Sequence, residues 1–241
     1  MRSYTAMLFA KHGMRLFASA IRDLSQELAE MSGLAENHAA RVIDALVNGD
    51  PQIAREALDG DAALHSVQRS IDERVVALIA KRRPAAAGLQ DVLGISGIAS
   101  ELACIGDLAK DIGKRIQTMN GDDLAGCSTL ALRPMASAVL TQLRDVIDSL
   151  TRRDVEKALD VWAGDQEVDR LCALLSRELV GRMTRDPAAI TCGIHLLFCA
   201  KNLERIGDHA TNIAEIIYHM VKGQRLSAER PKGDAISLLA S

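Results

Sequence analysis

Aromatic residues are scarce in this chain. Only 2% of the 241 residues are Phe, Trp or Tyr. β-Sandwiches and barrels usually fill their interiors with aromatic and β-branched side chains, so this scarcity argues against both architectures. Hydrophobic residues still make up 48% of the chain, and Ala and Leu supply most of them. We therefore expect an all-α protein whose helices pack closely on one another.

The chain also lacks an excess of basic residues, because its net charge is −3. No long basic run is present, which argues against nucleic acid as a main partner. No apolar run approaches the roughly 20 residues that span a bilayer, and no signal peptide is recognisable. We expect a cytoplasmic protein that meets the membrane only through its partners.

Cysteine pairs and enzyme motifs are missing as well. The five cysteines include no C-x-x-C pair, so we expect free and mostly buried thiols in a reducing compartment. The phosphate-binding loop G-x-x-x-x-G-K-[ST], the nucleophile motif G-x-S-x-G and the zinc motif H-E-x-x-H are all absent from the sequence. These absences favour a protein that is not an enzyme.

Apolar residues recur at helical spacing along most of the chain. Asp-Pro or Arg-Pro pairs precede several of these stretches, as is typical of proline in a first helical turn. The pattern predicts a polar linker at 120–129 and a loose tail after Gly223. The helices are expected at 5–31, 34–48, 51–81, 85–118, 134–151, 155–184 and 188–222.

The two halves of the sequence resemble each other. Gly60-Asp61 recurs as Gly164-Asp165, an offset of 104 residues, and Ile105–Ala109 recurs as Ile206–Ala210, an offset of 101 residues. A three-helix bundle is the simplest unit of this size that hides its apolar faces. We therefore expect two tandem three-helix bundles related by a pseudo-two-fold duplication, at 1–118 and 119–223, with a tail at 224–241.

Acidic residues follow helical spacing in the second repeat. Residues four apart share one helix face, so each set forms a stripe of oxygen ligands. Two facing stripes would suit a hard or borderline cation, although an ordinary solvated acidic face is the alternative. The stripes consist of Asp165 and Asp169 on one helix, and of Glu204, Asp208 and Asn212 on the next.

Glycine lies inside both copies of the second motif, at Gly106 and Gly207. Glycine in a helix interior costs about 1 kcal/mol relative to alanine. Its presence in both repeats favours close approach of a neighbouring helix or of a ligand.

Two segments of the second repeat resemble the motifs of a known family. Residues 202–213 read N-L-E-R-I-G-D-H-A-T-N-I, and residues 165–169 read D-Q-E-V-D. Both segments resemble the repeated motifs of the PhoU family of phosphate-uptake regulators. The resemblance extends from about Met7 to Val221 and includes the duplication.

The resemblance implies a function and a set of partners. PhoU-like proteins are negative regulators of the phosphate regulon, and they are thought to connect the ATPase subunit of the phosphate ABC transporter with a sensor histidine kinase. They are cytoplasmic and often dimerise, so a homodimer is expected. Some hold multinuclear iron or zinc clusters. The metal candidates carried over to this chain are Asp165, Asp169, Glu204, Asp208 and Asn212.

The first repeat departs from the family pattern. Ala103-Cys104 stands where the family has Glu-Arg, and His65 stands where the second-helix motif ends in Asp. Imidazole with carboxylates would still suit zinc or iron. The alternative is that the first-repeat site is degenerate and binds no metal. The candidates that remain are Asp61, His65, Asp107 and Asp111.

Alternatives stay open on these residues alone, both for the ligand of the acidic face and for the function. Mg²⁺ or Mn²⁺ could replace iron or zinc, and a metal-free acidic face could dock on a partner. A carboxylate-bridged metal enzyme on a helical bundle is the rival function, although such enzymes usually carry Glu-x-x-His pairs that are missing here. A plain helical scaffold without a metal is a further alternative.

Overall fold

The computed structural model describes residues 2–58, 61–82, 86–119 and 131–226, with side chains except at 2–14, 57–58, 61, 82 and 86–87. These residues are helical almost throughout, and no strand occurs among them. The expected all-α class is confirmed. The expected linker at 120–129 and most of the expected tail lie outside the described residues.

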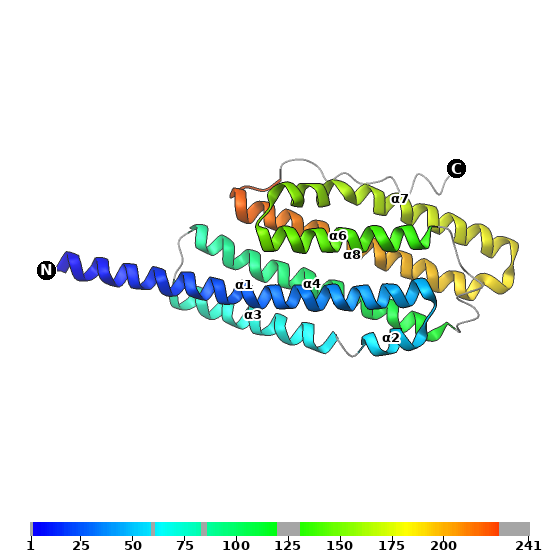
Figure 1. The fold of residues 1–241 in the computed structure, drawn as a ribbon, viewed down its shortest axis with the longest axis horizontal. Coiled ribbons are helices and arrows are strands. Elements are labelled where there is room, and N and C mark those ends of the chain that lie inside the picture. Colours follow the sequence, from blue (N-terminus) through cyan, green and yellow to red (C-terminus); the bar gives the residue numbers. More distant parts are fainter. Residues whose placement is uncertain (1, 59–60, 83–85, 120–130, 227–241) are drawn as a thin grey trace.

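The first bundle is built from four helical segments that occupy three positions. They are α1 (Arg2–Asn48), α2 (Pro51–Leu58), α3 (Asp61–Arg82) and α4 (Ala86–Thr118). Both α2 and α3 pack against α1 and α4, so together they take the place of one long helix (Figure 1). The single helix expected at 51–81 is therefore divided, with α2 ending at Leu58 and α3 beginning at Asp61.

The second bundle repeats this arrangement. It consists of α6 (Leu132–Arg152), α7 (Val155–Arg185) and α8 (Ile190–Lys222), with a short 3₁₀ turn, η1 (Pro187–Ala189), between the last two. Each of its three long helices packs against the other two. The expected pair of tandem three-helix bundles is confirmed.

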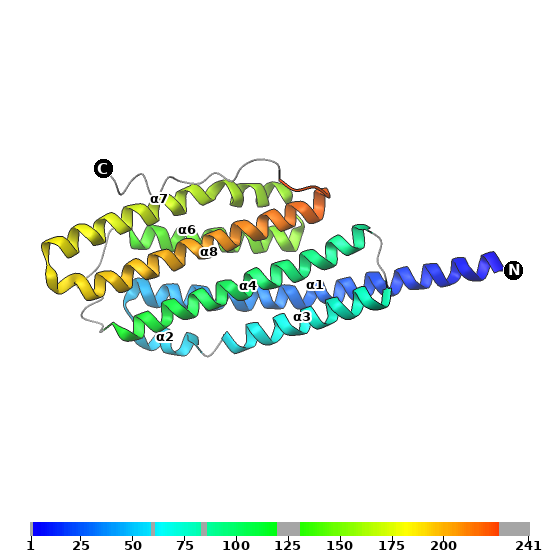
Figure 2. The same cartoon turned by 180° about the vertical axis from the view of Figure 1, so that it is seen from behind.

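The two bundles lie side by side along their length. α4 packs along α8, and α1 packs along α6, as Figure 1 and the reverse view in Figure 2 both show. Their buried side chains form one continuous hydrophobic core. That core is aliphatic, because none of the described aromatic side chains is fully buried. Small residues such as Ala35, Ala39 and Ala109 are completely buried, which allows the close helix packing expected from composition.

Aspartate caps open equivalent helices in the two repeats. The carboxylate of Asp50 accepts hydrogen bonds from the backbone N–H groups of Gln52 and Ile53, at 2.8 and 3.2 Å. The carboxylate of Asp154 accepts one from Lys157 N–H at 3.2 Å. Each cap satisfies donors that the first helical turn leaves unpaired. The internal repeat therefore includes the helix start signals.

Helix α1 is continuous where the sequence predicts a break. Helices were expected at 5–31 and 34–48, but α1 runs through Ser32-Gly33 without interruption. Met31 and Ala35 are fully buried on the core side of this turn, and the Ser32 hydroxyl donates to the carbonyl of Leu28 at 2.9 Å. Packing on the core therefore overrides the low helix propensity of glycine.

Replacing Gly33 with alanine is expected to stabilise the protein by about 0.5 to 1 kcal/mol. Gly33 is exposed, and a Cβ built there meets no atom within 4 Å, so only the helix propensity changes. Urea unfolding followed by far-UV circular dichroism measures the difference. An unchanged or lower free energy of unfolding for Gly33→Ala would contradict a continuous helix at this position.

Residues with a left-handed backbone conformation follow the ends of three helices. Gly49 after α1 and Gly223 after α8 have φ angles of 67° and 75°, whereas Arg153 after α6 has φ 52° and ψ 38°. Glycine adopts this conformation freely, but a residue with a Cβ loses about 1 to 2 kcal/mol there. Arg153 is the one described residue other than glycine with positive φ. The backbone N–H groups of Arg153 and Asp154 donate to the carbonyls of Leu150 and Ser149, so this conformation caps the end of α6.

Among the described residues, one helix is long and apolar enough to cross a membrane by length and composition. It is the segment Gly88–Thr118 of α4, and 61% of its most apolar window is buried inside the protein. From the sequence alone, no apolar run of this length was expected. Burial against α1, α3 and α8 accounts for its apolar character, as in the core helix of a bundle.

Candidate functional site

The acidic residues of the second repeat divide between the bundle interior and its surface. Asp165 and Asp169 of α7 are only 2% and 8% exposed. Asp165 faces the core, where its Oδ1 lies 3.2 Å from the hydroxyl of Thr211 and 3.5 Å from the amide nitrogen of Gln142. Asp165 therefore belongs to a buried polar network between α6, α7 and α8.

Gly207 makes room for this network. A Cβ at Gly207 would lie 2.9 Å from Oε1 of Gln142 and 3.4 Å from a methyl carbon of Val168. The close approach expected at this glycine is thus made by side chains of α6 and α7. Gln142 is 6% exposed, and its amide nitrogen also donates to the hydroxyl of Thr211 at 3.0 Å.

Glu204 lies in the middle of α8, close to two other acidic residues and to one lysine. Burial raises the pKa of its carboxyl above the ordinary value, an ion pair with Lys201 lowers it in part, and the carboxylates of Asp208 and Asp169 raise it further. The second oxygen of Glu204, Oε2, is buried and has no hydrogen-bond partner among the described residues. The carboxyl groups of Asp169 and Asp208 therefore act on that of Glu204 across α7 and α8.

Asn212 turns away from these carboxyl groups toward the other bundle. Its Nδ2 donates to Oε2 of Glu101 on α4 at 3.1 Å, and Nδ1 of His209 lies 2.6 Å from the same oxygen. Burial raises the pKa of Glu101, but the hydrogen bonds from His209 and Asn212, with the charge of His209, hold it below its ordinary value. Glu101 thus joins the two bundles.

The first-repeat candidates are closer to solvent. Nε2 of His65 on α3 lies 3.0 Å from Oδ1 of Asp107 on α4, so the structure brings these two candidates together. Asp111 pairs instead with Lys114 at 3.0 Å on its own helix. The side chain of Asp61 lies outside the described residues. Cys104 is exposed, and its thiol is not part of the His65–Asp107 pair.

The described cysteines fit the expectation of free thiols. Cys172, Cys192 and Cys199 are buried, and burial raises the pKa of Cys172 to about 11 and that of Cys199 to about 12. Such thiols stay protonated near neutral pH and are poor metal ligands and nucleophiles. Cys127 lies outside the described residues.

The fit of these sites to a metal is incomplete. The buried, unpartnered oxygen of Glu204 and the nearby carboxyl groups have the chemistry that a cation would complete. However, no three His, Cys, Asp or Glu side chains in the described residues converge closely enough to hold a metal ion. The metal sites predicted for both repeats stay predictions.

Sequence reasoning did not single out Glu101, Gln142 or Thr211. Gln142 carried a usable signal, because it stands in the apolar face of its helix between Val139 and Val146, where a buried polar side chain needs a partner. Glu101 carried none. Its partners are more than 100 residues away in the sequence, on α8.

The Glu101 contacts predict a loss of stability in acid. A carboxyl whose folded pKa is lowered stabilises the protein fully above its unfolded pKa, and this contribution is lost as the pH falls through the lower folded value. Glu101→Gln is therefore expected to lower the free energy of unfolding at pH 7 and to reduce its decline below about pH 4.5. Urea unfolding at a series of pH values checks this.

The matched control is Glu73→Gln, which changes an exposed glutamate on α3. It should leave the acid profile of the wild-type protein unchanged. If Glu101→Gln also follows the wild-type profile, the contact with His209 and Asn212 contributes nothing to stability.

Comparison with known proteins agrees with the architecture. The family model described as PhoU domain matches residues 28–116 and 132–217. The chain is 41% identical over 230 residues to a phosphate-specific transport system accessory protein PhoU homolog of Rhizobium meliloti (strain 1021), covering 95% of this chain and 97% of that protein.

Two further proteins extend the comparison. The chain is 38% identical over 227 residues to the PhoU homolog of Caulobacter vibrioides (strain NA1000 / CB15N), covering 94% of this chain and 99% of that protein. The crystal structure of PhoU from Pseudomonas aeruginosa matches with a TM-score of 0.81 at 32% identity, covering 86% of this chain and all of that one. The chain therefore belongs to the PhoU family.

Proposed function

We propose that the protein is a cytoplasmic negative regulator of phosphate uptake and of phosphate-regulon signalling. It acts as an adaptor between the ATPase subunit of a phosphate ABC transporter and a sensor histidine kinase, without catalysing a reaction itself. The observation that carries this proposal is the match of both repeats to the PhoU domain, together with relatives whose names make them accessory proteins of a phosphate-specific transport system.

The arrangement of the two bundles supports an adaptor. Each bundle exposes helix faces of its own, while α4 and α8 hold the pair together through one shared core. A rigid double bundle can contact two proteins at a fixed separation. The structure describes no nucleotide-binding loop, and the acidic groups of α7 and α8 are partly engaged in internal contacts.

Genetics and co-precipitation test the adaptor together. Deletion of the gene is expected to derepress phosphate-starvation genes in phosphate-replete cells, and the tagged protein should recover both the kinase and the ATPase subunit. Complementation with Gly33→Ala serves as the matched control, because this exposed change should leave function intact. Recovery of neither partner, with normal repression after deletion, would overturn the proposal.

We also propose that the protein forms a homodimer. Light scattering coupled to gel filtration measures the mass directly, and one chain has a mass of 26.0 kDa. A mass of twice this value at micromolar concentration supports the dimer. A single-chain mass at the same concentration contradicts it.

A second proposal concerns the acidic groups of α7 and α8. Asp169, Glu204 and Asp208 would draw together to bind iron or zinc, with Mg²⁺ or Mn²⁺ as the alternative, because these side chains do not converge closely enough in the described structure. The buried oxygen of Glu204 that lacks a partner favours this proposal, because a cation would supply the missing contact. Asp165 and Asn212 contribute less directly, since both have hydrogen-bond partners elsewhere.

The amount of metal bound to the purified protein tests this second proposal directly. The protein is purified without chelator, incubated separately with Zn²⁺ and Fe²⁺, desalted and analysed for bound metal. Glu204→Gln is expected to lose most of the bound metal. The control Glu167→Gln changes an exposed residue of α7 that pairs with Arg170, and it should bind as the wild type does. A metal-free wild-type protein, or equal binding by Glu204→Gln, would overturn the proposal.

A further inference from the structure

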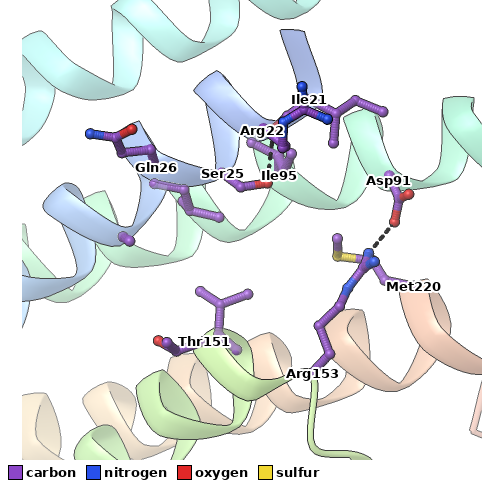
Figure 3. A pocket seen from close by; sticks show the side chains of 12 residues that line it. Ile21, Arg22, Ser25, Gln26, Asp91, Ile95, Thr151, Arg153 and Met220 are labelled. Atoms are coloured by element: carbon purple, nitrogen blue, oxygen red, sulfur yellow. Dashed lines mark hydrogen bonds and ion pairs between the residues drawn. The ribbon is translucent and has the colours of Figure 1, made fainter. Parts of the chain in front are cut away.

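A cavity of about 380 Å³ lies at the junction of the two bundles. Its walls come from α1 and α4 of the first bundle and from α8 and the end of α6 of the second (Figure 3). This volume is within the range of pockets that take small molecules, and such pockets occur preferentially between domains. The cavity is separate from the acidic groups of α7 and α8, because none of them lines it.

The interior of the cavity is mainly apolar. Side chains from all four helices contribute to it, so an apolar group placed there would touch both bundles at once. Burial of such a group is favourable in proportion to the apolar area removed from water. The apolar lining includes Leu28 from α1, Ile95 from α4, Leu150 from α6 and Met220 from α8.

The polar lining offers hydrogen-bond donors mainly through arginine. The hydroxyl of Ser25 already donates to the carbonyl of Ile21, and that of Thr151 to the carbonyl of Ile147, both at 2.9 Å. Each hydroxyl has a single proton, so neither can donate to a ligand in this arrangement. The guanidinium groups of Arg22 and Arg153 carry five donors each.

The two arginines differ in their partners. Arg22 makes no ion pair with another side chain that the structure describes. Arg153 pairs with Asp91 of α4 across the junction, and Figure 3 shows this contact along the cavity wall. Two arginines and one aspartate leave the lining with a net charge of about +1, which calls for one negative charge on a ligand.

The backbone of Arg153 caps the end of α6 beside the cavity. It holds the left-handed conformation that glycine adopts after α1 and α8. The N–H groups of Arg153 and Asp154 satisfy the carbonyls of Leu150 and Ser149 in the last turn, which fixes where the Arg153 side chain begins. Here the guanidinium of Arg153 connects α6 to α4 at the edge of the cavity.

We propose that this cavity binds a small amphipathic anion, with an apolar body against Leu28, Ile95 and Met220 and a carboxylate or phosphate head on Arg22 and Arg153. Because both bundles contribute walls, the bound anion would contact the two halves of the protein together. The site is independent of the adaptor role and of any metal.

Binding of three probes to the full chain tests the proposal. Octanoate and octyl phosphate carry the two kinds of anionic head, and octan-1-ol has the same apolar body without charge. Isothermal titration calorimetry is expected to show saturable binding of at least one anion, at least about tenfold tighter than octan-1-ol. The tighter anion identifies the preferred head group.

Substitutions test separately how the arginine charges and the space in the cavity contribute to anion binding. Arg22→Gln should weaken anion binding at least about tenfold, and Ala29→Phe should abolish it by filling the cavity from α1. Arg153→Gly keeps the left-handed helix end and should weaken binding without loss of folding. The control Arg69→Gln changes an exposed arginine of α3 outside the cavity lining and should bind as the wild type does.

The proposal fails on any of three results. The first is that neither anion binds saturably. The second is that octan-1-ol binds as tightly as both anions. The third is that Arg22→Gln and Ala29→Phe bind the anions as the wild type does. Circular dichroism of each variant confirms that it is folded before binding is measured.

Discussion

Leu203→Ala is expected to lower the free energy of unfolding by about 3 to 4 kcal/mol. Leu203 on α8 is completely buried, so its truncation removes apolar contacts and leaves a cavity that the packed helices close only in part. This loss is a large fraction of the 5 to 15 kcal/mol that is typical of a folded protein. Urea unfolding measured by far-UV circular dichroism gives the value.

The duplication supplies a second variant at the matching position. Leu102 on α4 corresponds to Leu203 through the offset of 101 residues, and it is 1% exposed. Leu102→Ala should therefore cost a similar amount, about 3 to 4 kcal/mol. The control Leu174→Ala changes a leucine of α7 that is 37% exposed, and it should cost less than about 1 kcal/mol because its methyl groups are partly in water already.

The shape of the unfolding curve carries further information. α4 packs along α8 and the buried residues form one core, so both bundles should unfold in one transition and each variant should shift that whole transition. Two separate transitions, with only one of them shifted by Leu203→Ala, would show that the bundles unfold independently. A loss below about 1 kcal/mol would mean that the site relaxes to fill the cavity.

Local signals explain why most of the fold is visible in the sequence. Periodic apolar residues and the caps at Asp50 and Asp154 specify helices through neighbours a few residues away. The repeat adds a second independent copy of the same signals. The error at Gly33 arose where a local rule competes with burial of Met31 and Ala35, which depends on residues far away in the sequence.

The candidate site was less predictable because its contacts are not local. Spacing of four residues correctly puts Asp165 and Asp169 on one side of α7, but it does not reveal that Asp165 enters the core beside Gln142 of α6. Likewise, Asn212 shares a helix face with Asp208 in the sequence pattern, and packing of α8 on α4 directs it to Glu101. Helix periodicity specifies a face, and the packing of neighbouring helices decides what that face meets.

Thr211→Val is expected to lower the free energy of unfolding by about 2 kcal/mol. Thr211 is fully buried, and valine has nearly the same shape, so the change removes the hydroxyl with little change in packing. The single hydroxyl proton lies within reach of Oδ1 of Asp165 at 3.2 Å and of the Gly207 carbonyl at 3.1 Å, and the oxygen accepts from Gln142 at 3.0 Å. The variant therefore loses one donated and one accepted hydrogen bond.

Loss of these bonds is costly because the remaining partners stay buried. Without the Thr211 hydroxyl, the amide nitrogen of Gln142 keeps only longer contacts, 3.4 Å to the Val161 carbonyl and 3.5 Å to Oδ1 of Asp165. Its buried amide oxygen already lacks a hydrogen-bond partner among the described residues. Thr184→Val is the matched control, since that hydroxyl donates to the Val180 carbonyl on an exposed face of α7. It should change stability by less than about 0.5 kcal/mol. If Thr211→Val costs no more than Thr184→Val, the buried network does not contribute to stability, and Asp165 is held in the core by packing around it.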